Sequence, residues 1–172
     1  AAYLRLHQYP QANLAFVEGA KINPNNLALL DFIVSRYKEE KQHQQLVELI
    51  EALNVTTPGI GLLHALLGET LSEGLAQHRP AIQAFTNAIA LEPSRSDYYN
   101  GMGLTYYRMQ QYEAALKLFV AATEINPNDA TARYNEACVL ALMRRSEEAL
   151  ISLGDALSLD PKLQDHARGD AL

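Results

Sequence analysis

Side chains that could perform catalysis or hold a metal ion are dispersed along this sequence. The histidines have no partner three or four residues away on one helix, whereas a zinc site needs three or four converging ligands. They are His7, His43, His64, His78 and His166. Cys138 is the only cysteine, and no fixed histidine or lysine neighbour favours a reactive thiolate. The sequence therefore predicts no metal site and no cofactor, and Cys138 is interpreted as a small apolar side chain.

Two further patterns could suggest catalysis or phosphate binding. The adjacent carboxylates Glu39-Glu40 and Glu147-Glu148 would point about 100° apart on a helix, so neither can act as a catalytic pair. Gly59-Ile60-Gly61 and Gly101-Met102-Gly103 lack the strand and helix context that a phosphate-binding loop needs. We therefore expect the chain to have no enzymatic activity.

Composition narrows the class of partner. The 172 residues carry 20 Asp plus Glu against 14 Lys plus Arg, and this net charge of −6 argues against nucleic acid. No apolar run approaches the roughly 20 residues that span a bilayer, so no membrane insertion is predicted. The single cysteine is typical of a reducing compartment, which favours a cytoplasmic location. Ala1 opens directly into structured-looking sequence, and we expect the chain to be part of a longer protein.

Prolines reveal an internal repeat. Five of them recur at a constant spacing, except that the second gap is longer by a single residue: Pro24, Pro58, Pro93, Pro127 and Pro161. Eight residues before each stands a large apolar residue: Phe16, Ile50, Phe85, Phe119 and Leu153. Twelve residues before each stand Ala12, Leu46, Ala81, Ala115 and Ala149. Small residues recurring beside large ones are typical of helices that approach closely.

A second periodic set lies upstream in each repeat. Apolar positions recur there at spacings of three, four and seven, which predicts one face of a helix. The fourth repeat shows it as Met102, Gly103 and Tyr106, and the fifth has Glu136 where Met102 stands. Each repeat is thus predicted to be a pair of short amphipathic helices. The one-residue excess before Pro93 is assigned to a surface turn over residues 73–78, because such turns absorb insertions at little cost.

The linkers between repeats carry residues that can cap the helix that follows. Asn or Asp is available for this in the linkers at residues 23–26 and 126–129, and Ser is available in the linker at residues 93–96.

The pattern Tyr99-x2-Met102-Gly103-x2-Tyr106, Ala115-x3-Phe119 and Pro127 resembles the signature of the tetratricopeptide repeat family. This resemblance implies an all-α fold, a right-handed superhelical array of antiparallel helix pairs. We expect the second half of a first repeat at 1–24, a degenerate repeat at 25–58, a repeat with the insertion at 59–93, the repeat nearest the signature at 94–127, a further repeat at 128–161, and the start of a C-terminal helix at 162–172.

The resemblance also implies where a partner would bind. The family places the first helix of each pair on a concave surface, so its outward positions are candidate contacts. They are Phe32, Leu66, Glu69, Asn100, Leu104, Tyr107, Arg108, Tyr134, Asn135, Cys138 and Leu142. Apolar and aromatic residues in this set suit an amphipathic helix or an extended peptide, and Asn100, Asn135 and Arg108 could bond its backbone or a carboxylate. The predicted function is a scaffold or adaptor that binds a segment of another protein.

Other interpretations stay open at this stage. Tyr107 and Tyr134 could pack between adjacent helices, and Arg108 could be solvated. The carboxylate clamp of some family members is not expected, because only Asn135 agrees with it. The array could also form homo-oligomers through exposed ends, or recruit substrates for an enzyme in a larger chain.

Overall fold

The computed structural model describes residues 8–22 and 27–164, and these divide between two compact units. The N-terminal unit comprises residues 1–92 and the C-terminal unit residues 93–172. Each unit is described by itself below. The expected start of a helix at 162–172 lies mostly outside the described residues, as do residues 1–7 of the first half-repeat.

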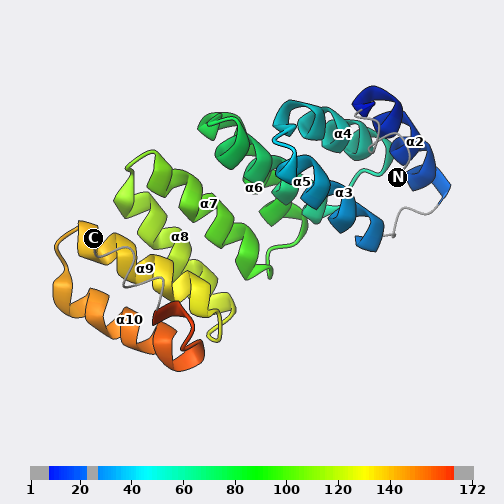
Figure 1. The fold of residues 1–172 in the computed structure, drawn as a ribbon. Coiled ribbons are helices and arrows are strands. Elements are labelled where there is room, and N and C mark those ends of the chain that lie inside the picture. Colours follow the sequence, from blue (N-terminus) through cyan, green and yellow to red (C-terminus); the bar gives the residue numbers. More distant parts are fainter. Residues whose placement is uncertain (1–7, 23–26, 165–172) are drawn as a thin grey trace. The chain divides into compact units, whose positions relative to one another are not determined.

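Every regular element in the described part of the chain is helical (Figure 1). The N-terminal unit contains α2 (Tyr9–Ile22), α3 (Leu27–Glu39), α4 (His43–Thr56), α5 (Gly61–Glu69), the π-helix η1 (Thr70–Gly74) and α6 (His78–Leu91). The C-terminal unit contains α7 (Ser96–Arg108), α8 (Tyr112–Ile125), α9 (Ala130–Leu142) and α10 (Ser146–Leu159). None of these helices is long and apolar enough to cross a membrane.

The helices pack as consecutive pairs, which confirms the predicted all-α fold. Contacts join α5 to α6, α7 to α8 and α9 to α10, the last pair running from yellow to orange in Figure 1. In the C-terminal unit the second pair follows the first at the spacing of the prolines, since α7 begins at Ser96 and α9 at Ala130. Between the two helices of each pair, a residue with a positive φ turns the chain: Gln110 in the first pair and Arg144 in the second.

The inserted residue lies between Leu71 and Gln77, which overlaps the predicted segment 73–78, and the structure shows that this segment begins in the π-helix η1 rather than in a plain turn. In the pairs without it, the backbone N–H of the residue before the second helix bonds five residues back, as Gln111 does to the carbonyl of Tyr106 (3.0 Å). In the pair with it, Gln77 bonds six residues back, to Leu71 (2.8 Å). The extra residue widens the last turn of the first helix into η1, where Ser72 is buried.

Glycine and phenylalanine fit together inside two of the helix pairs. A Cβ added to Gly103 of α7 would lie 2.6 Å from the ring of Phe119 in α8, and one added to Gly68 would lie 2.8 Å from that of Phe85. Both rings are buried. The fifth repeat has Ala137 where these two pairs have glycine, and it has the smaller Leu153 in place of phenylalanine. A larger residue on the first helix of the pair is thus accompanied by a smaller residue on the second helix, so the space between the two helices stays filled.

The degenerate second repeat keeps its helices. Leu46 and Leu53 stand where other repeats carry small residues, and both are buried in the core of the N-terminal unit. They pack there with Tyr37, Leu49 and Ile50, so large apolar side chains fill this part of the unit.

Of the predicted helix caps, the one in the linker at residues 126–129 is confirmed, whereas the linker at residues 23–26 lies outside the described residues. The Asp129 carboxylate accepts a hydrogen bond from the backbone N–H of Ala132 (2.9 Å) at the start of α9. Ser96 does not cap α7, because it is already the first helical residue and Arg95 holds the cap position without a side-chain hydrogen bond.

Candidate functional site

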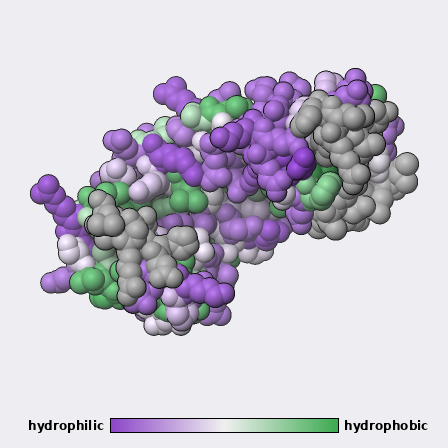
Figure 2. Space-filling view, in the orientation of Figure 1, coloured by the Kyte–Doolittle hydropathy of each residue, from purple (hydrophilic) through white to green (hydrophobic). Residues whose placement is uncertain are grey.

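An open cavity of about 690 Å³ in the C-terminal unit is a candidate site. Helices α9 and α10 supply most of its wall, and the end of α7 contributes Tyr107. The lining residues are mainly apolar: Tyr107, Tyr134, Ala137, Cys138, Ala141, Leu142, Ser146, Ala149, Leu150 and Leu153. Figure 2 shows apolar side chains as green patches on a largely hydrophilic surface. Such a cavity can bury apolar side chains of a ligand.

The cavity brings four of the predicted contact residues together. Tyr107, Tyr134, Cys138 and Leu142 all line it, and they come from two different helices. Leu142 is 49% exposed and Tyr107 37% exposed. The ring of Tyr107 also lies 6.0 Å, centroid to centroid, from that of Tyr112 at the start of α8. Tyr107 therefore both packs against α8 and reaches the cavity wall.

Polar predicted residues lie on the same helices. Asn135 Nδ2 donates a hydrogen bond to Asn100 Oδ1 (2.9 Å), which links α9 to α7. Arg108 is exposed at the end of α7, next to Tyr107 in sequence. Leu104 is instead half-buried and packs against the core between α8 and α9. Of the predicted polar contacts in this unit, Asn100 and Asn135 thus already hold each other in place.

The predicted residues of the N-terminal unit form a smaller set. Phe32 is 55% exposed on α3. Glu69 of α5 is paired with Lys38 of α3, with 2.8 Å between Oε2 and Nζ. Leu66 is half-buried against the core of this unit. Of these three predicted residues, Phe32 is therefore the exposed apolar one, whereas the Glu69 carboxylate is already held by Lys38.

Sequence reasoning missed the part of the cavity that α10 supplies. Ser146, Ala149, Leu150 and Leu153 are second-helix residues, and only first-helix positions were considered as contacts. The repeat period could have been used to predict these α10 residues. Each lies one repeat after a residue of α8 that belongs to the apolar cluster with Val139 of α9, so the period places all four on the equivalent surface.

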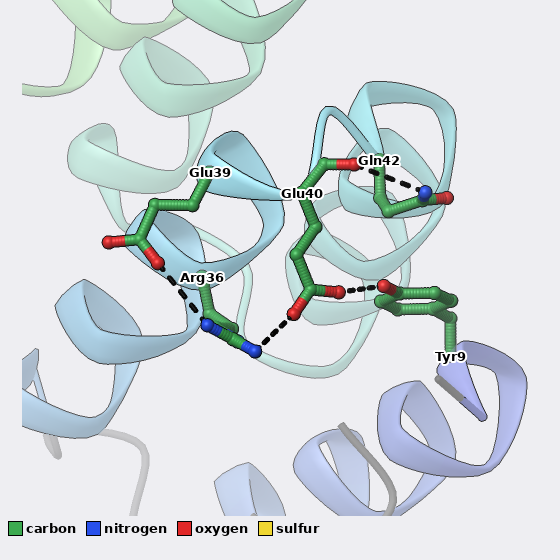
Figure 3. A network of polar contacts seen from close by, with 5 residues as sticks. All are labelled: Tyr9, Arg36, Glu39, Glu40 and Gln42. Carbon is green, nitrogen blue, oxygen red and sulfur yellow. Dashed lines mark hydrogen bonds and ion pairs between the residues drawn. The ribbon is translucent and has the colours of Figure 1, made fainter. Parts of the chain in front are cut away.

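A polar cluster in the N-terminal unit was also missed (Figure 3). The Glu40 carboxylate lies between the Arg36 guanidinium, at 2.6 Å, and the Tyr9 hydroxyl, which donates a hydrogen bond to it. Burial and the Glu40 carboxylate raise the pKa of Tyr9 above its usual value of 10.0. These contacts join the start of α2 to the end of α3 across 31 residues of sequence. The cluster therefore connects α2 to the end of α3, and its hydroxyl, carboxylate and guanidinium groups bind one another.

A carboxyl group is half-buried between α9 and α10. Ser152 Oγ donates a hydrogen bond to Glu136 Oε1 (3.2 Å), and burial raises the pKa of Glu136 above its usual range. The equivalent residues one period earlier are apolar, Met102 and Leu118. A carboxyl and a hydroxyl group thus occupy positions that hold two apolar side chains in the preceding pair.

Glu136→Gln should make the C-terminal unit more stable at neutral pH. A raised pKa means that the folded unit disfavours the charged carboxylate, so stability is highest below the usual pKa and falls as pH rises through the folded pKa. We expect a gain of about 0.5 to 1 kcal/mol at pH 7, because the half-exposed group still meets water. Urea unfolding at pH 5 and pH 7 measures it. Exposed Glu124→Gln is the control, and an equal gain there would contradict the expectation.

Among the described residues, no three histidine, cysteine, aspartate or glutamate side chains are grouped so that they could hold a metal ion.

The fold and the cavity define a class of repeat protein built from stacked helix pairs. Residues 96–129 and 130–163 each match the family model of the tetratricopeptide repeat. A TPR repeat-containing protein of Methanocaldococcus jannaschii is 27% identical over 135 residues, covering 78% of this chain and 22% of that protein, and together with the two matched repeats this places the chain in the tetratricopeptide repeat family. The matched segments begin two residues after the predicted repeats at 94–127 and 128–161, and the full set of repeat boundaries stays a prediction.

Sequence relatives are longer than this chain. Superkiller protein 3 of Schizosaccharomyces pombe is 24% identical over 168 residues, covering 93% of this chain and 12% of that protein. The peroxisomal targeting signal receptor of Pichia angusta is 26% identical over 163 residues, covering 87% of this chain and 29% of that receptor. The chain thus spans less than a third of either relative.

Solved structures share the fold. MamA superposes with a TM-score of 0.72 at 21% identity, covering 95% of each chain. YrrB, described as a tetratricopeptide repeat protein with an unusual peptide-binding site, superposes with a TM-score of 0.70 at 19% identity, covering 99% of this chain and 88% of its own. These similarities confirm the helix-pair architecture.

Proposed function

We propose that the chain is a protein-interaction scaffold whose C-terminal unit binds an apolar segment of a partner protein. The observation that carries the proposal is the cavity itself, because it gathers Tyr107, Tyr134, Cys138 and Leu142 around one space. An apolar side chain entering it would lose contact with water, which is the main source of affinity for such a segment.

Polar groups beside the cavity would orient the segment. The Asn100 and Asn135 amides have further hydrogen-bonding capacity for a peptide backbone, and the Arg108 guanidinium is suited to a carboxylate. Phe32, Leu66 and Glu69 of the N-terminal unit are proposed to contribute a second contact area. Two similar structures support a peptide partner. YrrB has a peptide-binding site, and the second TPR of Spaghetti (RPAP3) is bound to the HSP90 peptide SRMEEVD.

Tyr134→Ala combined with Arg108→Glu should weaken peptide binding at least about tenfold, because it removes an aromatic wall of the cavity and reverses the charge beside it. The probe is a random 16-residue peptide library displayed on phage and selected on the wild-type chain. Fluorescence anisotropy of the selected peptides then compares the wild type with the double variant.

A matched control separates binding from folding. Lys117→Glu reverses an exposed charge on α8 away from this cavity and should leave the affinity within about twofold. Circular dichroism must show the double variant folded. Peptides that bind both proteins equally would contradict the proposed site, as would failure to select any peptide.

A further inference from the structure

The two helix pairs of the C-terminal unit differ in what lies between their helices. In α7 and α8, the equivalent positions Met102 and Leu118 are both apolar. One period later, Glu136 and Ser152 form a hydrogen bond between α9 and α10, with 3.2 Å between Ser152 Oγ and Glu136 Oε1. Ser152 is buried, so this polar contact lies inside the pair.

A second polar contact joins the same two helices. Arg133 Nη1 on α9 lies 3.6 Å from Asp155 Oδ2 on α10. The equivalent residues one period earlier are a tyrosine and an alanine, which carry no charge at neutral pH. Arg133 stands three residues before Glu136, and Asp155 stands three residues after Ser152, so the two contacts are neighbours along the pair. The contact between α9 and α10 therefore includes charged groups at positions that are uncharged in α7 and α8.

One oxygen of the Glu136 carboxyl group is buried without a hydrogen bond. Within the described part of the chain, Ser152 bonds Oε1, and Oε2 has no partner. Burying a charged oxygen costs free energy unless donors or water replace its lost hydration. This cost falls when the carboxyl group takes up a proton, and it also falls when the two helices separate and water reaches the group.

The groups around Glu136 influence its charge in both directions. Burial raises the pKa of Glu136 above its usual range, the Ser152 hydrogen bond and the Arg133 charge lower it, and the Asp155 and Glu148 carboxylates raise it further. Among the described residues, all three of these charged groups belong to α9 or α10. The closed pair therefore disfavours the ionised form of this carboxyl group.

We propose that α9 and α10 form a pH-responsive pair, in which ionisation of Glu136 loosens the contact between the two helices while α7 and α8 stay closed. In an array of repeats each unit contacts only its neighbours, so one pair can open without unfolding the rest. Opening is rarest below the usual pKa of a carboxyl group, and it increases as pH rises through the pKa of Glu136 in the closed pair. The inference goes beyond the proposed function, because it requires no partner.

Hydrogen exchange of the full chain, followed by NMR, measures the opening of each helix. Protection factors correct for the chemical exchange rate at each pH. In the wild type, the opening constant of the α9 and α10 amides should rise about threefold or more between pH 5 and pH 7, whereas that of the α7 and α8 amides should change less than about twofold. Glu136→Gln should abolish the rise, because an amide does not titrate in this range.

Removing the neighbouring cation tests the electrostatic cause. Arg133→Gln takes away the charge that favours ionisation and leaves Asp155 without its ion-pair partner. It should enlarge the rise in the α9 and α10 opening constant by a further factor of about two or more. In the Glu136→Gln background, the same change should leave no dependence on pH to enlarge. A purely structural role for Arg133 would instead loosen the pair equally at both pH values.

Two further variants serve as controls. Glu147→Gln removes an exposed carboxyl group from the same pair and should leave the response to pH unchanged. Glu136→Met with Ser152→Leu recreates the apolar combination of α7 and α8, and it should slow the exchange of α9 and α10 and abolish their response. Circular dichroism checks that every variant is folded.

Three results would overturn the pH-responsive pair. The first is a rise between pH 5 and pH 7 that persists in Glu136→Gln. The second is an equal rise in α7 and α8, which would assign the effect to unfolding of the whole unit. The third is an opening constant in α9 and α10 that does not change with pH in the wild type.

Discussion

Gly103→Ala will lower the free energy of unfolding by about 1 to 3 kcal/mol. A Cβ at this position meets the Phe119 ring at 2.6 Å, and the ring is fully buried, so it cannot move into solvent. Alanine is a better helix former than glycine, so helix propensity alone would make the variant more stable. A lower free energy of unfolding would therefore show that overpacking outweighs this gain. Urea unfolding of the full chain, followed by circular dichroism, measures the difference.

A second substitution should restore most of this loss. Phe119→Leu in the Gly103→Ala background recreates the combination found one period later, where Ala137 accompanies Leu153. We expect the double variant to be more stable than the sum of the two single changes predicts, with a coupling of about 1 kcal/mol or more. Additive effects would show that the two side chains do not compete for the same space.

The control is the same substitution where space is available. Gly154 on α10 has nothing within 4 Å of an added Cβ. Gly154→Ala should therefore stabilise the helix by about 0.5 to 1 kcal/mol. A loss at Gly154 as large as that at Gly103 would refute the packing explanation.

Tyr37→Phe will cost the N-terminal unit about 1 to 2 kcal/mol at neutral pH. The Tyr37 hydroxyl donates a 2.5 Å hydrogen bond to Asn13 Oδ1, and the ring is fully buried against that of Tyr9 at 5.2 Å between centroids. Phenylalanine keeps the ring and removes the bond between α3 and α2. Tyr99→Phe, at an exposed hydrogen bond in the C-terminal unit, should change stability by less than about 0.5 kcal/mol.

The same variant should alter the response to alkali. Burial raises the pKa of Tyr37 to about 12, above its usual value of 10.0. This stabilising contribution is fully present below pH 10 and is lost as pH rises toward 12, about 1 kcal/mol of it between pH 9 and pH 11. Tyr37→Phe removes this loss, so the stability difference between the two proteins should shrink over that range. A difference that stays constant from pH 8 to pH 11 would contradict this expectation.

Much of the fold could be predicted because proline marks the end of each helix pair and small residues mark where the helices approach closely. The spacing from Pro24 to Pro161 gave the period, and the apolar spacing around Gly103 gave the helical face. The form of the insertion was not predicted, because a sequence alignment does not distinguish a longer turn from a wider helical turn. Ser96 and Asp129 are both cap-forming types, and only the backbone geometry shows that Ser96 is already inside α7.

The candidate site was predicted less completely than the fold. Tyr107 and Tyr134 line the cavity, as their positions on first helices suggested, whereas Leu104 faces the core beneath α9. Residues of α10 were missed because the resemblance directs attention to first helices. The contact between Tyr9 and Glu40 was unpredictable for another reason, since it joins residues 31 positions apart that no repeat position pairs.

The π-helix η1 has a consequence for how such a chain can change its length. An extra residue inside an ordinary α-helix would rotate every later side chain by about 100° and turn the apolar face away from its neighbours. At η1 the wider turn takes up this rotation, and α6 still spans 14 residues with Ala81, Phe85 and Ala88 buried. The end of the first helix is therefore a place where evolution can add a residue without disturbing the phase of the repeats that follow.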